Sequence, residues 1–336
     1  DRTKTIKKLT ALLFSATVLI LLGGCSSTEI IDSPQEPAKK GKTITLSLSA
    51  PENASTRADA DHQLRYVAKL VEGKLEDVNF KLLERKESLV SKGEKTTITF
   101  SVAEGDYTIM LFADYLPSNG ITTNEDGGYD DYYYKTRNNT DPKNITVQKY
   151  EVNNENLDCF GDVIVVNKTA DKVEKTITLK RLVSKVRFIS TTPLPNGQSL
   201  TSISYSEIPY YTTVTFTDNA DIKITQESDK SSGIIETKTL TANQDGEYEL
   251  FCYYTLANPD SNAKWMKAYS FTLNIENNEL KPIPIGQGKV PVIRNTVTTV
   301  KGEFLSPKEQ TKGDIILNLS TPDEWGKYES TTWQAQ

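Results

Sequence analysis

Histidine and cysteine, which most often ligate metals or act as catalytic nucleophiles, are nearly absent from this sequence. The 336 residues include one histidine, His62, and three cysteines, none of them at a spacing typical of a zinc site. A Ser–His–Asp or Cys–His group would have to use His62, and no glycine-rich phosphate-binding motif is present. Pairs of carboxylates exist among the 45 acidic residues but lie in no distinctive motif. We therefore expect a protein that is not an enzyme, with no metal site and no cofactor.

Basic clusters are also missing beyond the N-terminus. The 39 basic and 45 acidic residues give a net charge of −6, so nucleic acid is not an expected partner. Hydrophobic content is modest at 37%, while Thr, Ser, Asn and Tyr are abundant. That composition is typical of β-structure with solvated outer faces.

The N-terminus has the three parts of a bacterial lipoprotein signal. Four basic residues lie between positions 2 and 8, an apolar run covers 9–22, and "LLGGC" ends at Cys25. Small residues let a peptidase approach the backbone, and the thiol then receives the lipid. A plain secretory signal with an incidental cysteine is the alternative. We expect 1–24 to be the signal peptide, Cys25 to carry palmitate or another acyl chain, and 25–42 to be a flexible linker from the membrane.

Short alternating segments separated by turn residues fill the rest of the chain and predict all-β sandwiches. "QLRYVAKL" places alternate apolar residues on one face, and "GDYTIMLFADY" is apolar on both faces, as in a central strand. The best helix candidate is "LLERKESLVSK", near 82–92, although it lacks a clean apolar stripe. A break near 182–184 favours domains at 43–183 and 184–336.

Residues 43–58 combine a patterned strand with a soft loop. Ile44, Leu46 and Leu48 alternate with Ser and Thr, and a polar segment containing Arg57 and Ala58 follows. An arginine in a polar loop is ordinarily just solvated. Here small residues surround it, and a strand precedes it, which makes this loop a candidate cleavage point.

A long irregular segment, 114–140, is rich in tyrosine and aspartate. It offers a surface for a partner, since tyrosines provide rigid amphipathic contact area, at Tyr129, Tyr132, Tyr133 and Tyr134. Its acids could hold calcium, but their spacing does not match the twelve-residue loop. Alternatively, the tyrosines pack back onto the sheets. Elsewhere, Cys159 and Cys252 lie in apolar surroundings that favour buried free thiols over a disulfide.

Taken together, these stretches make the chain resemble the fimbrillin family, the lipoprotein subunits of Bacteroidia-type (type V) pili and related surface proteins. The likeness rests on the motif at Cys25, the strand with "ASTRA" at 44–58, "YTIMLFADY" with the tyrosine-rich segment and "DCFG", "LKRLVSKVRF" at 179–188, and "VPVIRNTVTTVKGEFL" at 290–305. They span nearly the whole chain. Cys159 and the extreme C-terminus depart from the pattern.

The resemblance implies two transthyretin-like β-sandwich domains in tandem and a protease-driven assembly route for a fimbrium that mediates adhesion. An Arg-specific protease would cut between Arg57 and Ala58 and release the strand at 43–49, whose place a strand from another pilus subunit would take. The C-terminal tail, 326–336, is a candidate donor strand, with a disordered end as the alternative. The lipidated protein would lie in the outer membrane at the cell surface, with a host protein or glycan as a further partner.

A rival interpretation is a monomeric surface lipoprotein that binds glycans. It shares the signal and the sandwiches. It would need a platform of exposed aromatic residues, for which Trp265 and the tyrosines at 129–134 are the candidates.

Overall fold

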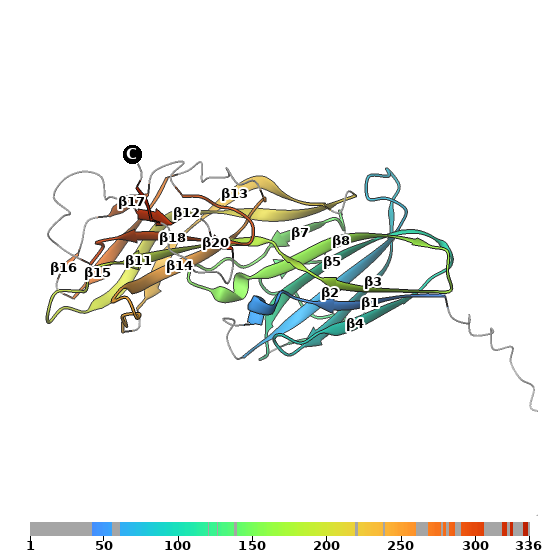
Figure 1. The fold of residues 1–336 in the computed structure, drawn as a ribbon, viewed down its shortest axis with the longest axis horizontal. Helices are drawn as coiled ribbons and strands as arrows, with labels where there is room; N and C mark the ends of the chain where they lie inside the picture. Colours follow the sequence, from blue (N-terminus) through green and yellow to red (C-terminus); the bar gives the residue numbers. More distant parts are fainter. Residues whose placement is uncertain are drawn as a thin grey trace, which may run out of the picture. The chain divides into compact units, whose positions relative to one another are not determined.

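The computed structural model describes residues 42–55, 61–119, 121–125, 127–137, 140–218, 221–237, 239–259, 268–276, 278–279, 282–285, 290–305, 318–320, 323–324 and 332–334. Within these ranges the chain forms strands and two short 3-10 helices, η1 (Glu52–Ser55) and η2 (Glu155–Leu157), and no α-helix (Figure 1). The all-β prediction is therefore confirmed. No helix in the described ranges is long and apolar enough to cross a membrane.

Two sheets are built mainly from the first half of the chain. The three-stranded sheet has the order β4-β1-β9, with β1 (Thr43–Ser49), β4 (Thr96–Ser101) and β9 (Lys172–Thr178). The five-stranded sheet has the order β10-β8-β5-β2-β3, with β2 (His62–Glu72), β3 (Lys81–Val90), β5 (Gly105–Pro117), β8 (Cys159–Lys168) and β10 (Lys180–Arg181). One buried apolar cluster takes residues from both sheets, so their inner faces pack together.

The predicted alternation is confirmed in β2, where Leu64, Tyr66, Ala68 and Leu70 all enter this cluster. Strand β5 is central in its sheet and buried on both faces, as its continuous apolar run predicted. The best helix candidate, near 82–92, is not a helix, because this segment forms β3 and pairs antiparallel with β2. Cross-strand pairing overrides the helix-forming composition of that segment.

The other two sheets contain the second half of the chain. The six-stranded sheet has the order β14-β11-β18-β19-β21, with β20 beside β18; its strands are β11 (Val183–Ser190), β14 (Tyr248–Leu256), β18 (Thr296–Gly302), β19 (Asn318–Ser320), β20 (Asp323–Glu324) and β21 (Thr332–Gln334). The seven-stranded sheet contains β6 (Tyr134–Lys135), β7 (Asn144–Val147), β12 (Leu200–Thr217), β13 (Asp221–Glu236), β15 (Tyr269–Ile275), β16 (Asn278–Glu279) and β17 (Ile283–Ile285). A second apolar cluster joins these two sheets.

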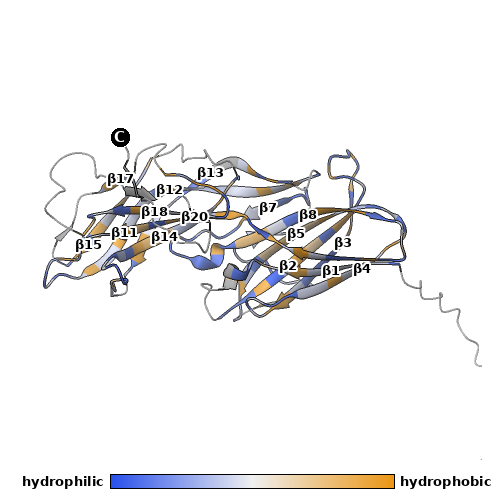
Figure 2. Cartoon of the chain, in the orientation of Figure 1, coloured by the Kyte–Doolittle hydropathy of each residue, from blue (hydrophilic) through white to orange (hydrophobic). Residues whose placement is uncertain are grey.

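A third apolar cluster covers the outer face of the five-stranded sheet. It combines Val67 and Phe112 with Val214 and Ile224, which lie on either side of the expected domain boundary. Strand β7 likewise precedes that boundary yet pairs with β12. Figure 2 shows apolar segments interrupted by polar ones along the strands of both halves. The boundary between 183 and 184 stays a prediction.

Candidate functional site

Strand β1 is the middle strand of its sheet and the link that holds that sheet together. It pairs antiparallel with β4 and parallel with β9, and the sheet contains no other ladder in the described residues (Figure 1). If β1 left, β4 and β9 would each lose their one ladder partner in this sheet. We call the space that β1 fills between β4 and β9 the β1 slot.

Polar contacts fix β1 in the slot at both ends and along its outer face. The Thr43 amide donates to the Asp171 carbonyl at 2.8 Å, and the Leu179 amide donates to the Ser49 carbonyl at 2.8 Å. On the outward face, the hydroxyl of Thr45 on β1 forms a hydrogen bond with the hydroxyl of Thr99 on β4, with 3.2 Å between the two oxygens. These short polar side chains leave the outer face solvated, as the alternation predicted.

The inner face of β1 supplies the apolar side chains of the predicted removable strand. Ile44, Leu46 and Leu48 are at most 1% exposed and belong to the cluster shared with the five-stranded sheet. Full burial of such a side chain contributes about 1.5–3 kcal/mol, so the three together contribute about 5–9 kcal/mol. That sum is comparable with the whole stability of an ordinary domain. Departure of β1 is therefore strongly unfavourable unless another strand takes its place.

The residues after β1 turn away from the sheet. Ala50 and Pro51 lead into η1, and the Ala54 side chain is buried in the same apolar cluster as β1. Arg57 and Ala58, the predicted cleavage pair, lie outside the described residues. So do Cys25, the predicted lipid site, and Trp265, the predicted aromatic contact.

The four tyrosines at 129–134 divide into two pairs. Tyr133 and Tyr134 are buried, and the Tyr134 hydroxyl donates to the Leu157 carbonyl at 2.6 Å. These two follow the alternative in which the tyrosines pack back onto the sheets. Tyr129 and Tyr132 are partly buried, and the ammonium of Lys149 lies 4.7 Å from the Tyr132 ring centroid. Only this second pair is placed where a partner could touch it.

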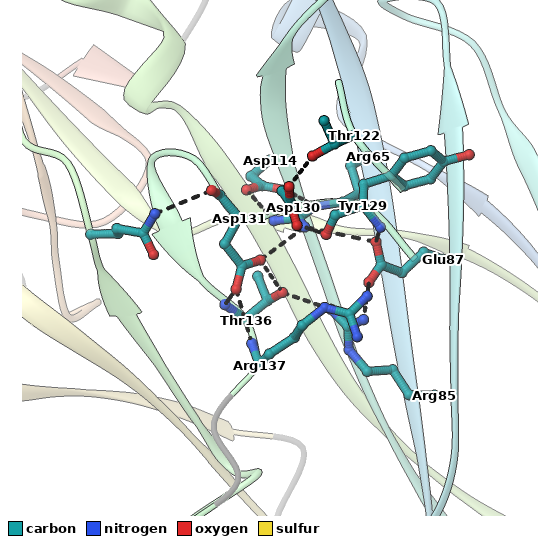
Figure 3. Close-up of polar contacts among 11 residues, drawn as sticks. Arg65, Arg85, Glu87, Asp114, Thr122, Tyr129, Asp130, Asp131, Thr136 and Arg137 are labelled. Carbon is teal, nitrogen blue, oxygen red and sulfur yellow. Dashed lines mark hydrogen bonds and ion pairs between the residues drawn. The ribbon is translucent and has the colours of Figure 1, made fainter. Parts of the chain in front are cut away.

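A buried charge cluster fastens this segment to the five-stranded sheet, and we define it as Arg65, Arg85, Glu87, Asp114, Asp131 and Arg137 (Figure 3). Arg65 on β2 lies directly opposite Asp114 on β5 and donates two hydrogen bonds to it, at 2.9 and 2.8 Å. The third guanidinium nitrogen of Arg65, Nη1, donates to Asp131 Oδ1 at 2.9 Å. Glu87 on β3 accepts from the Tyr129 amide at 3.0 Å and from Arg137 at 2.9 Å. The three cations and three anions balance.

The electrostatics of the cluster favour ionised Asp131. Burial opposes ionisation, but hydrogen bonds from Thr136 and the charge of Arg65 outweigh it and lower the pKa of Asp131. Nearby on β2, burial and the charge of Arg85 lower the pKa of Lys69 to about 7. The Lys69 ammonium donates to the Pro142 carbonyl at 2.9 Å and is almost fully buried.

A polar groove of about 490 Å³ lies beside the cluster, lined by Glu84, Arg85, Lys86, Glu87, Ser88, Thr97, Ile98, Thr99, Gly127, Gly128 and Arg137. Its walls come from β3, β4 and the tyrosine-rich segment. A Cβ at Gly128 would overlap the Arg137 guanidinium and lie 2.7 Å from Glu87 Oε1, so a larger residue there would displace these two side chains. The groove offers hydrogen-bond donors and acceptors with little apolar surface.

No arrangement for metal or nucleophilic chemistry emerges from the described part of the chain. It contains no group of three His, Cys, Asp or Glu side chains that could hold a metal ion. His62 stacks on Tyr133, with Nε2 3.2 Å from that hydroxyl and Nδ1 3.0 Å from Asp61. Cys159 and Cys252 are buried free thiols, as predicted.

The charge cluster was not predicted from the sequence, although two residues of the sequence point to it. Arg65 and Asp114 are charges of opposite sign inside strands that are otherwise apolar, "QLRYVAKL" and "GDYTIMLFADY". A charge is almost never fully buried unless it is paired, so the two could have been matched. The burial of Ala54 beyond the end of β1 had no comparable signal.

The chain is similar to solved structures of fimbrial proteins. One is a fimbrial assembly protein from Parabacteroides distasonis, with 14% identity and a TM-score of 0.43, covering 84% of this chain and 96% of that one. Another is the fimbrial anchor protein Mfa2 from Porphyromonas gingivalis, with 11% identity and a TM-score of 0.43, covering 84% of this chain and 98% of that one.

No curated protein matches the sequence. A family model matches residues 35–334, a range that includes every residue the structure describes. The chain therefore belongs to the family of unknown function DUF6562.

Proposed function

We propose that the chain is a subunit of a cell-surface fimbrium with a role in adhesion, made as a lipidated precursor and assembled by strand exchange. The observation that carries this proposal is the position of β1. It is a central strand whose inner face is buried, and within the described residues it alone links β4 to β9. It is also the first strand after the predicted linker, and a polar loop containing Arg57 follows it.

Cutting after Arg57 converts β1 from part of the chain into a separate peptide. Its departure exposes the free edges of β4 and β9 beside an apolar trough. A strand with the same alternation can enter by β-augmentation, since its backbone restores both ladders and its apolar side chains fill the trough. The free edges of β4 and β9 and the three apolar positions of the trough would accept a strand with the alternation of β1. We therefore expect the partner to be another subunit that carries such a strand.

The predicted donor, the C-terminal tail, has a partner within its own chain. Strand β21 pairs antiparallel with β19 through Thr332–Gln334. A tail that donates to a neighbour must first leave this edge position. The structure describes the backbone of β21 and not its side chains. The pattern of the tail therefore rests on the sequence, in which alternate positions hold Tyr328, Ser330, Thr332 and Gln334 on one face and Glu329, Thr331, Trp333 and Ala335 on the other.

Digestion of the purified full chain with an Arg-specific protease tests the proposal. We expect a product that begins at Ala58, by N-terminal sequencing, and that forms SDS-resistant ladders. The variant Arg57→Ala should block both events, whereas Lys42→Ala, at the other end of β1, should block neither. A chain left intact at Arg57, or a cut chain that stays monomeric, would refute the proposal.

The polar groove favours a second candidate, a monomeric lipoprotein that binds glycans. The groove lies next to Tyr129, and its lining is rich in hydroxyl, carboxylate and guanidinium groups suited to sugar hydroxyls. A glycan array probed with the full chain tests this function. Binding that Gly128→Leu abolishes would support it, and an absence of any bound glycan would rule it out.

A further inference from the structure

Two buried tyrosines face the segment that follows β1. Tyr66 lies on β2 and Tyr115 on β5, and the two strands are paired so that both side chains enter the cluster shared with β1. Both residues are 0% exposed. Burial raises the pKa of both hydroxyls, so each stays protonated and can donate a hydrogen bond.

The hydroxyls bind backbone groups of the segment 50–54. The Ala50 amide donates to Tyr66 Oη at 2.9 Å, and Tyr66 Oη donates onward to the Glu94 carbonyl at 3.2 Å. Tyr115 Oη donates to the Ala54 carbonyl at 2.6 Å. The turn between them is closed by the Ala54 amide, which donates to the Pro51 carbonyl at 2.9 Å. The Ala54 side chain is 5% exposed and packs in the apolar cluster, so a larger side chain there would displace its neighbours.

We propose that Tyr66 and Tyr115 form a second binding subsite beside the β1 slot, one that recognises the turn after the inserted strand. The ligand is a peptide that carries a backbone N–H directly after its strand and a carbonyl on a small residue four positions later. This inference rests on the proposed function, because the subsite matters for exchange only if the β1 slot is emptied. In the uncut chain, residues 50–54 occupy it.

The subsite gives strand exchange a direction and a length. A peptide that fills both the slot and the subsite must run as β1 does, antiparallel to β4 and parallel to β9. It must also extend five residues beyond a seven-residue strand. A shorter strand, or one inserted in the opposite direction, leaves a buried Tyr115 hydroxyl without its acceptor, which is unfavourable. The cut peptide keeps both contacts and should therefore leave the slot slowly.

Hydrogen exchange on the intact full chain tests the subsite without any cleavage. The variant Tyr115→Phe removes one hydroxyl and nothing else, so the amides of residues 50–55 should exchange about tenfold faster. Tyr107→Phe is the matched control. Tyr107 belongs to the same apolar cluster, but its hydroxyl donates to the Ala103 carbonyl and not to the turn at 50–54. Unchanged exchange at 50–55 in Tyr115→Phe would overturn the proposal.

A second measurement follows the peptide after digestion with an Arg-specific protease. The fragment that ends at Arg57 should dissociate about tenfold faster from Tyr115→Phe than from the wild type or Tyr107→Phe. Equal rates would show that the hydroxyl does not hold the turn during exchange. A chain that is not cut after Arg57 would instead refute the proposed function, and hydrogen exchange alone would then decide whether the tyrosines bind the turn.

Discussion

Substitution of Leu46 by alanine perturbs the centre of β1 and yields a magnitude that follows from the structure. Leu46 is 0% exposed, and its side chain lies between Ile44 and Leu48 in the cluster that joins the two sheets. Leucine-to-alanine changes at such sites cost about 2–5 kcal/mol, from lost transfer free energy and the cavity left behind. We expect a loss of about 3 kcal/mol in the free energy of unfolding, which is a large fraction of an ordinary domain's stability.

Urea unfolding of the uncut full chain measures this loss from the shift of the midpoint at constant slope. The matched control is Thr45→Ala, the next residue on the same strand, which faces outward and bonds to Thr99. Its loss should be about 1 kcal/mol or less. Equal losses for the two variants, or a larger one for Thr45→Ala, would refute the assignment of the two faces and with it the apolar trough.

Three further predictions concern the interior. In Arg65→Met two buried carboxylates lose their shared cation, so the free energy of unfolding should fall by about 3–5 kcal/mol in a denaturant titration; an unchanged midpoint would contradict the role of Arg65. The pKa of Lys69, about 7, lies below its unfolded value, so the unfolded chain binds more protons between about pH 7 and pH 10 and stability should rise with pH there. In Lys69→Met this slope should be shallower, and an equal slope would exclude Lys69 as its source. Peptide-resolved alkylation should leave Cys159 and Cys252 unmodified in the folded chain and modify both after denaturation, whereas modification before unfolding would contradict their burial.

The sheets could be predicted from the sequence where one face is buried. The alternation of Ile44, Leu46 and Leu48 determines which side of β1 faces the core, because a shift by one residue would expose all three. The same reasoning placed β2, whereas the continuous apolar run of β5 predicted a central strand buried on both faces. It failed for β3, whose side chains are only partly buried and give no clear period, so pairing with β2 decides its structure.

The contacts between sheets could not be predicted, because they join residues far apart in the chain. Tyr115 reaches Ala54 and Arg65 reaches Asp131 only once the strands have paired. The tyrosine-rich segment shows the same limit, since its composition suits exposure and burial equally well. Arg65 and Glu87 hold the Tyr129 backbone, and the Leu157 carbonyl accepts from the Tyr134 hydroxyl, so Tyr134 is buried while Tyr129 is partly exposed.

The central claim is that β1 is replaced by a strand from another subunit. Peptide-resolved hydrogen exchange on the SDS-resistant assemblies, formed after digestion of the full chain, tests it most directly. Residues 43–57 should be absent from the assemblies, while the amides of β4 and β9 stay as protected as in the uncut chain. Assemblies that retain residues 43–49, or in which β4 and β9 exchange freely, would contradict replacement of β1.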